Sequence, residues 1–442
     1  MPELTNPPLA LRPALRLPVR FAGAGAGLGE LSWGQREIWL TMLRQRSWLP
    51  IGGWSRLAPG TTLADVAGEL RWAVERYQPM RTRLRLDHGG RPLQSVADRG
   101  TVGLDVYDCP DGEDPEAFVI ALDARDRARP YDFVEEWPVR MGVVRHRGAP
   151  THLSTVMTHL VTDGLGGRIF LAEIADRRSA PAATGTPPLE QARWQAGPAG
   201  QRQNASALRH WARVIALLPA RSTMDEGPFL RGEFRTTALP LAVHVLSERA
   251  DVDSSQVLMA LVAAALPGDS PAVLRPMVSN RFRRGFERVV AMVAQRGICA
   301  ADVAGVPFAE ALRRVGAAAM AAYKYAYVDP DAVGELFAAA GADPHAGVWF
   351  NDRRVASRQG FAGPVPADEA LRSAPPGSLR WTVAQEDPFD PLSIDIDDDH
   401  DGLLLTVFTD AARLPAAGAE ALVRRVEELA VREAVAMLEE EP

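Results

Sequence analysis

The spacing of apolar residues predicts helices along most of the chain. Between Leu63 and Val74, apolar residues recur every three or four positions, which is the period of one helical face, so a helix is expected from about Leu63 to Tyr77. Another helix is expected to begin after Leu31, where Ser32 can cap its N-terminus. Further helices are predicted at about 115–127, from Gly166 onwards, and at 205–217, 254–266, 307–325, 330–340 and 415–438.

Shorter apolar runs bounded by turn residues predict strands between these helices. The segment from Arg81 to Val96 predicts a hairpin that turns at His88-Gly89-Gly90. Other strands are predicted at about 139–145, 153–158, 240–247, 272–279, 346–351, 379–384 and 403–409. This mixture of elements predicts an α/β (α+β) protein with two lobes of similar size.

Composition adds the expected boundaries between these lobes. Residues 1–30 are rich in Pro, Ala and Gly, so a poorly ordered leader is expected there. Residues 178–204 are rich in Ala, Pro, Gly and Gln, which is typical of a domain boundary. The predicted organisation of the 442 residues is therefore a leader at 1–30, an N-terminal lobe at 31–185 and a C-terminal lobe at 186–442.

Charge, cysteine content and hydropathy argue against several classes of protein. The net charge of −7, with no run of basic residues, disfavours binding to nucleic acid or to an anionic membrane. Cys109 and Cys299 lie outside any CxxC or Cys/His cluster, so neither a disulfide framework nor a metal site is expected. The longest apolar run, Val257–Leu266, is too short to span a bilayer. We therefore expect a soluble cytoplasmic protein.

The candidate chemistry lies at the end of the strand predicted at 153–158. His159 follows this strand, and a turn then brings Asp163 and Gly164. Because side chains alternate along a strand, Thr158 should face away from His159. Histidine is well suited to take a proton near neutral pH, and a glycine lets the backbone approach a substrate closely. These residues alone leave two interpretations open, a catalytic histidine and an ordinary structural histidine at a strand end.

The pattern His159-x-x-x-Asp163-Gly164 resembles the HHxxxDG motif of nonribosomal-peptide condensation domains and related acyltransferases. Other segments resemble further motifs of that family and occur in the family's order. They are the opening segment 31–39, the segment 76–84 (similar to RHExLRTxF), the segment 130–141 (similar to PFDLxxxPLLR) and the final strand and helix from Gly402. The matches extend over about residues 31–435, so the chain looks like a free-standing condensation domain.

This resemblance implies a fold and an activity. The fold would be two chloramphenicol-acetyltransferase-like lobes in a V-shaped pseudo-dimer with a tunnel between them. The activity would be transfer of an acyl or aminoacyl group from a carrier-protein thioester to an amine, which forms an amide in nonribosomal peptide synthesis or related secondary metabolism. No metal or bound cofactor would be needed, because an acyl- or peptidyl-carrier protein brings the phosphopantetheine arm. A monomer is expected, with an amine or alcohol acceptor that is either small or carrier-bound.

The resemblance also implies roles for single residues. His159 would position or deprotonate the nucleophile, and the backbone N–H of Gly164 would help to hold the oxyanion. Asp163 would be structural, in a salt bridge with Arg281. The side chains of the substrate tunnel would include those of Thr158, Ser279 and Asn351.

Some positions depart from the family pattern and leave alternatives open. Thr158 stands in place of the first His, Leu165-Gly166 replaces the usual Trp-Ser, and the segment 291–299 barely matches the family's acceptor-side motif. One alternative is an O-acyltransferase of the same superfamily, which forms an ester. Another is a non-catalytic module that binds a carrier and recruits a different enzyme to it.

One further motif can be discounted. The segment Asp397-x-Asp399-x-Asp401-Gly402 matches the start of a calcium-binding loop, but Phe408 stands where such a loop has a glutamate. We expect an acidic hairpin turn there instead.

Overall fold

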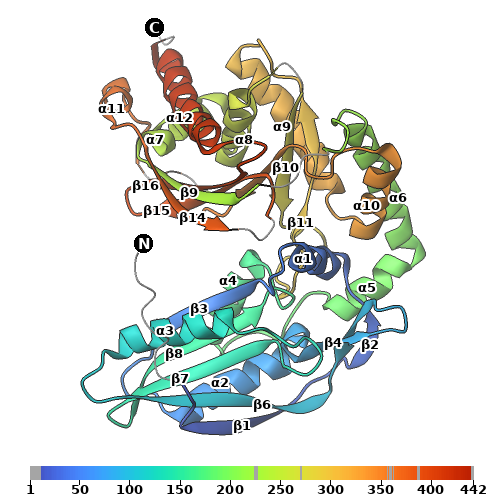
Figure 1. The fold of residues 1–442 in the computed structure, drawn as a ribbon, viewed down its shortest axis with the longest axis vertical. Coiled ribbons are helices and arrows are strands. Elements are labelled where there is room, and N and C mark those ends of the chain that lie inside the picture. Colours follow the sequence, from blue (N-terminus) through green and yellow to red (C-terminus); the bar gives the residue numbers. More distant parts are fainter. Residues whose placement is uncertain are drawn as a thin grey trace. The chain divides into compact units, whose positions relative to one another are not determined.

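The computed structural model describes residues 11–439 except for 223–226, 269–270, 356, 358–360, 362 and 386–388. These residues form two compact units. The first unit contains the chain up to Leu43, Ser47–Gly200 and Arg281–Val293, and the second contains Arg44–Arg46, Gln201–Asn280 and the chain from Ala294 onwards. Each unit is a mixed α/β structure, as the sequence predicts (Figure 1).

The first unit is built on a five-stranded sheet. Its strand order is β1 (Leu15–Ala22), β6 (Arg99–Cys109), β7 (Val139–His146), β8 (Ala149–Thr158) and β3 (Pro50–Arg56). All neighbouring strands are antiparallel except β6 and β7. The other elements of this unit are α1 (Trp33–Arg44), α2 (Leu63–Arg76), η1 (Gln78–Arg81), α3 (Pro115–Ala128), α4 (Gly164–Ala175), α5 (Pro188–Ala196) and a small sheet ordered β2 (Gly27–Glu30), β5 (Pro92–Val96), β4 (Thr82–Leu86).

Helices cover both faces of the five-stranded sheet (Figure 1). Val143 and Val144 are neighbours on β7 and so point to opposite faces. Val143 packs in one core with residues of α2 and α4, and Val144 packs in another core with residues of α3. The loop between α3 and β7 is fixed by Arg140, whose side chain is 8 % exposed.

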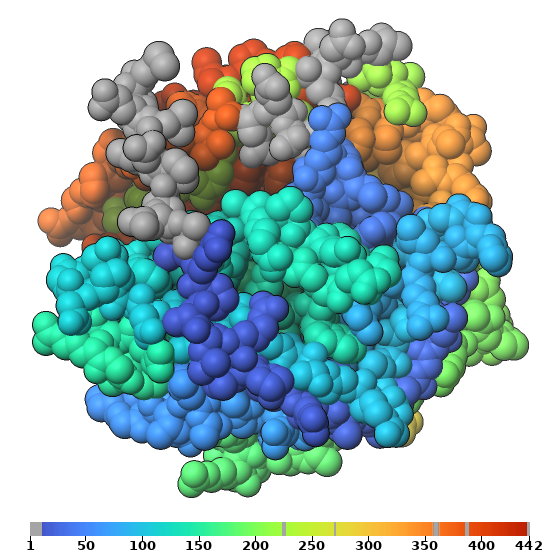
Figure 2. Space-filling view, turned by 60° about the horizontal axis from the view of Figure 1, so that its bottom comes forward, coloured from blue at the N-terminus to red at the C-terminus, as the bar shows by residue number. Residues whose placement is uncertain are grey.

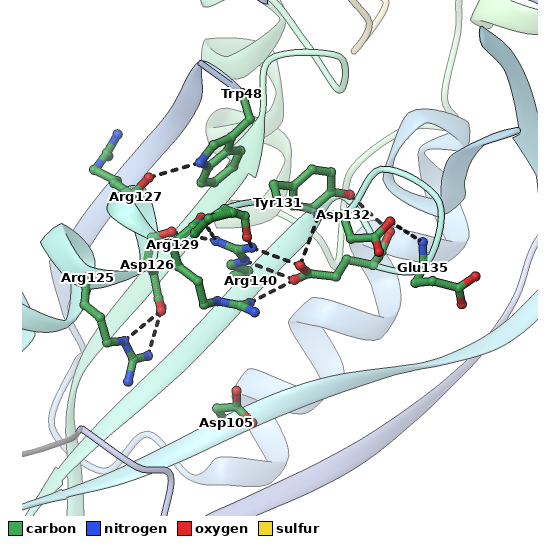
Figure 3. A network of polar contacts seen from close by, with 12 residues as sticks. Trp48, Asp105, Arg125, Asp126, Arg127, Arg129, Tyr131, Asp132, Glu135 and Arg140 are labelled. Atoms are coloured by element: carbon green, nitrogen blue, oxygen red, sulfur yellow. Dashed lines mark hydrogen bonds and ion pairs between the residues drawn. The ribbon is translucent and has the colours of Figure 1, made fainter. Parts of the chain in front are cut away.

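Figure 3 shows the polar groups that converge on Arg140. Its guanidinium donates to the backbone carbonyls of Asp126 and Pro130 and lies against the rings of Trp48 and Tyr131. Its Nη2 also donates to Glu136 Oε1 at 3.0 Å. This network holds the loop against β7, which pairs with β8, the strand that precedes His159.

The second unit is built on a larger sheet that is covered by helices. The strand order is β11 (Gln295–Arg296), β10 (Ala272–Val278), β13 (Val348–Asp352), β15 (Leu392–Asp399), β16 (Gly402–Asp410), β9 (Phe229–Thr236) and β14 (Ser378–Gln385), and β12 (Cys299–Ala301) also pairs with β10. The helices are α6 (Pro198–Ile215), α7 (Ala238–Ala250), α8 (Ser254–Ala265), α9 (Phe308–Tyr325), α10 (Pro330–Ala340), α11 (Asp368–Ser373) and α12 (Ala416–Glu439). Residues of α7, α8 and α12 pack on one face of this sheet and form its main core.

The strand predicted at 240–247 is wrong, because this segment lies within helix α7 (Ala238–Ala250). Nearly all its apolar side chains are buried, including Leu239, Val243 and Val245. A helix buried around most of its circumference has a continuous apolar run, and such a run has the same pattern as a buried strand.

The poorly ordered leader is also wrong where the structure describes it. Residues 15–22 form β1, which pairs with β6 along its whole length, and residues 27–30 form β2. Val19 and Phe21 belong to the core, and Figure 2 shows the N-terminal segment (dark blue) on the surface of the first unit, where β1 is the edge strand. Residues 1–10 lie outside the described part of the chain. The unit boundary also differs from residue 185, because α5 and the segment 281–293 belong to the first unit.

Candidate active site

The candidate site is a turn between β8 and α4 in the first unit. β8 ends at Thr158 and is paired with β7 on one side and β3 on the other, so the turn begins from a firmly held strand. The N–H of Val161 donates to the carbonyl of Thr158 at 3.0 Å and closes the turn. Asp163 then caps α4, since its Oδ1 accepts from the N–H of Gly166 at 2.9 Å.

Asp163 is buried and fully engaged in hydrogen bonds. Its Oδ2 accepts from Arg281 Nη1 at 3.0 Å and from the N–H of Val293 at 3.1 Å. Its Oδ1 accepts from Gly166 and lies 2.9 Å from Arg281 Nη2, which completes a bidentate ion pair. A buried ion pair is tolerated when its geometry is good and hydrogen bonds accompany it, and here both carboxylate oxygens of Asp163 accept hydrogen bonds. These contacts join the turn to Arg281 and to Val293.

His159 is partly exposed at the start of the same turn. Burial of its ring lowers the pKa of His159, while backbone groups of His159 and Thr162 and the charge of Asp163 act in the opposite direction. The net direction is downward, so the ring is neutral at pH 7. A neutral imidazole can accept a proton, which is what a general base must do.

Two glycines of α4 have different surroundings. A Cβ atom added at Gly164 would meet no other atom within 4 Å, and this residue is exposed. A Cβ added at Gly166 would lie 2.2 Å from Thr162 Oγ1 and 2.7 Å from Arg281 Nη2. Open space therefore adjoins Gly164, whereas Gly166 is required for the close packing of the salt bridge. The sequence shows Gly166 only as a departure from the family motif and carries no signal for this second role.

Thr158 is buried. Together with Gln35, Tyr131 and Leu160 it lines a small internal cavity of about 10 Å³. Its Oγ1 accepts from the N–H of Leu160 at 3.5 Å, so the hydroxyl contacts the backbone of the turn. The tunnel role of Thr158 stays a prediction.

The remaining predicted tunnel residues belong to the second unit. Ser279 follows the last residue of β10, and Asn351 lies in β13. The Nδ2 of Asn351 donates to Asp395 Oδ1 at 2.9 Å, and Arg353 pairs with the other oxygen of that carboxylate at 3.0 Å. The structure brings together His159 with the residues that brace its turn, and the roles of Ser279 and Asn351 stay predictions.

The segment 31–39, which resembles the opening motif of the family, caps helix α1. Ser32 and Gln35 cap α1 reciprocally, because the Ser32 N–H donates to Gln35 Oε1 at 3.1 Å and the Gln35 N–H donates to Ser32 Oγ at 3.4 Å. This confirms Ser32 as the predicted N-cap. Arg81, from the second segment, is buried and donates to the carbonyl of Ala97 at 2.7 Å.

The structure also describes the acidic segment 397–402 and allows a search for metal sites and membrane-spanning helices. Asp399 and Gly402 face each other at the end of the antiparallel hairpin of β15 and β16, so the acidic hairpin turn is confirmed. Within the described ranges, no three His, Cys, Asp or Glu side chains gather in a way that could hold a metal ion. No described helix combines the length and the apolar character needed to cross a membrane.

Comparison with known proteins gives consistent matches over most of the chain. Residues 56–336 match the model of the condensation domain family. One component of the linear gramicidin synthase of Brevibacillus parabrevis is 24 % identical over 331 residues, which are 66 % of this chain and 4 % of that protein. The chain therefore spans only a small part of this relative.

Many solved structures match this chain, two of them from the biosynthesis of enacyloxin and teicoplanin. One is a condensation domain that mediates chain release from the enacyloxin polyketide synthase, with a TM-score of 0.72, 18 % identity and coverage of 95 % of this chain and 84 % of the other. The second is an X-domain from teicoplanin biosynthesis in complex with OxyB, with a TM-score of 0.66, 17 % identity and coverage of 95 % and 96 %. At these identities the likeness shows a common architecture.

Proposed function

We propose that this chain, which belongs to the condensation domain family, is an acyltransferase that moves an acyl or aminoacyl group from a carrier-protein thioester to an amine. The product is an amide of nonribosomal peptide synthesis or related secondary metabolism. The observation that carries this proposal is the difference between Asp163 and His159 in the β8–α4 turn. Asp163 is saturated by hydrogen bonds from Arg281, Val293 and Gly166, whereas His159 remains neutral and partly exposed.

The proposed chemistry uses the neutral imidazole of His159 as the general base. The amine nitrogen attacks the thioester carbonyl carbon, and the C–N bond forms as negative charge develops on the carbonyl oxygen. His159 takes the proton from the attacking amine. When the C–S bond breaks, the phosphopantetheine sulfur leaves with the electron pair and receives a proton from the imidazolium of His159. One proton therefore moves from amine to thiol, and no external acid or base is consumed.

The Gly164 N–H is proposed as the donor to the developing oxyanion. Gly164 is the first residue of α4, and the N–H groups of a first helical turn have no carbonyl partner within their helix. The same position is exposed and has open space beside it. One donor of this kind contributes about 3 kcal/mol to a transition state.

The wider architecture belongs to the same proposal. The two units are proposed to be the chloramphenicol-acetyltransferase-like lobes of the family, arranged in a V around a substrate tunnel that includes Thr158, Ser279 and Asn351. The partner is an acyl- or peptidyl-carrier protein, which supplies the phosphopantetheine arm. Membership of the condensation domain family supports a carrier-bound substrate.

Two other functions remain as outcomes of the test. A neutral His159 can take a proton from an alcohol as well as from an amine, so the same site would also serve ester formation. A recruitment module is suggested by the fold shared with the X-domain that was solved with OxyB.

Single-turnover transfer followed by intact-mass spectrometry tests the proposal. An acyl-loaded carrier is mixed with a panel of amines and alcohols, using wild type and His159→Ala. Amine-dependent unloading that slows about a hundredfold in the variant, as expected for a lost general base, supports amide formation. Unloading by alcohols alone assigns the ester-forming function. Carrier binding without transfer by either protein leaves the recruitment module.

A further inference from the structure

The segment Arg281–Val293, called the 281–293 loop below, is anchored at both ends on the same residue. At its start, Arg281 pairs with Asp163, and at its end the N–H of Val293 donates to that carboxylate. The N–H of Asp163 in turn contacts the carbonyl of Ala291 at 3.4 Å. The residues that precede and follow this loop in the sequence belong to the second unit, whereas the loop itself belongs to the first unit.

The middle of the 281–293 loop has its own anchor at the other end of helix α4. Arg288 Nη2 lies 3.1 Å from Oε1 of Glu173, which is in the last turn of that helix. Asp163 and Glu173 are ten positions apart, which corresponds to about 15 Å of helix. The loop is therefore fixed at two points that span nearly the whole length of α4.

Glu173 is held firmly enough to serve as such an anchor. Its carboxylate is 7 % exposed, and its Oε2 accepts from the hydroxyl of Tyr77 at 2.6 Å and from Arg76 Nη2 at 2.8 Å. Burial would raise the pKa of Glu173, but the hydrogen bonds from Tyr77, Arg76 and Arg288 lower it overall. Glu173 is therefore ionised at neutral pH, and α2 ties it to the sheet through Arg76.

The two arginines that anchor the 281–293 loop, Arg281 and Arg288, differ in exposure. The side chain of Arg281 is 9 % exposed, whereas that of Arg288 is 56 % exposed. Removal of Arg288 thus leaves the buried carboxylate of Glu173 paired, because Glu173 keeps its bonds to Arg76 and Tyr77. The exposed pair can be broken while the fold of the first unit is retained.

We infer that Arg288 is a positioning residue of the His159 site. Its pair with Glu173 sets where the 281–293 loop lies along α4, and so it holds the Ala291 carbonyl and the Val293 N–H against Asp163. Through Asp163 this contact fixes the turn that carries His159 and Gly164. The expected effect of Arg288 on the reaction rate rests on the proposed function, whereas its expected effect on the position of the loop rests on the geometry alone.

The experiment compares Arg288→Gln with Arg284→Gln, a matched change at an exposed arginine of the same loop. Hydrogen exchange is measured on peptides that contain Val293 and on peptides of α2 as an internal reference. In Arg288→Gln we expect exchange to increase severalfold in the loop peptides and to stay unchanged in α2. Single-turnover transfer should slow about twofold to fivefold, the range expected for a partly exposed ion pair, with unchanged affinity for the loaded carrier. Arg288→Lys, which keeps the charge, should restore most of the rate.

Three results would overturn the inference. The first is loop exchange in Arg288→Gln that equals that of Arg284→Gln. The second is a uniform rise of exchange across the first unit, which would mean a general loss of stability. The third is a normal transfer rate despite a loosened loop. If the wild type transfers nothing, the proposed function fails, and the exchange measurement still decides whether Arg288 holds the loop.

Discussion

Replacing Asp163 with asparagine should destabilise the first unit strongly. Each carboxylate oxygen of Asp163 receives two donors: Oδ2 receives Arg281 Nη1 and the Val293 N–H, and Oδ1 receives Arg281 Nη2 and the Gly166 N–H. An asparagine side chain has one oxygen and one NH₂ group. Whichever way it is turned, its NH₂ faces two other donors.

The magnitude follows from the burial of the pair. Both side chains are less than one-tenth exposed, at 5 % for Asp163 and 9 % for Arg281, so the substitution leaves a buried, unpaired guanidinium. Breaking a buried ion pair from one side costs about 3–5 kcal/mol. The measurement is the free energy of unfolding from denaturant titration. The double variant Asp163→Asn with Arg281→Gln, which leaves no unpaired charge, should lose less than the sum of the two single changes.

Asp105→Asn is the matched control. Arg16 also binds Asp105 through two hydrogen bonds, but the side chain of Arg16 is 67 % exposed, so this change should cost less than about 1 kcal/mol. If Asp163→Asn is as stable as wild type and yet inactive, the structural reasoning is wrong, and Asp163 takes part in the reaction directly.

Two other predictions concern the same turn. Gly166→Ala should lose about 1–3 kcal/mol of stability from overpacking against Thr162 and Arg281, whereas Gly164→Ala should keep the thermal midpoint of wild type and slow transfer, because the added methyl group occupies the space left for substrate. Equal destabilisation by both changes would contradict this assignment. The pH dependence follows from His159, whose pKa is lowered below 6.5 in the folded chain, so the unfolded chain binds the proton more tightly. The contribution of His159 to stability should be complete above about pH 6.5 and fall as the pH decreases below that value, so His159→Gln should lose less stability than wild type in urea titrations between pH 8 and pH 5.

Much of the local structure could be predicted because its signals lie within a few residues. The stripe from Leu63 to Val74 marks α2, and Ser32 with Gln35 caps α1 through bonds between neighbours in the sequence. The turn from His159 to Gly164 was also visible as a short pattern, and the resemblance to condensation domains added Arg281 as the partner of Asp163. The structure shows that pair as a bidentate contact.

Other features depended on contacts between distant segments. The strand prediction for 240–247 failed because burial on several sides hides the helical period of α7. β1 was hidden by its Pro- and Ala-rich surroundings, and its partner β6 lies far away in the sequence, at pairs such as Leu15 with Val106.

The sequence by itself determined the fold class, the elements with a clear period and the residues of the candidate turn from His159 to Gly164. Only the tertiary structure decided how that turn is supported. Gly166 is needed because an arginine from position 281 fills the space beside it, and Glu173 anchors a loop that is more than 100 positions further along the chain. Periodicity and capping report on neighbours in the sequence, whereas the fit of a side chain against a distant loop depends on how the whole unit packs.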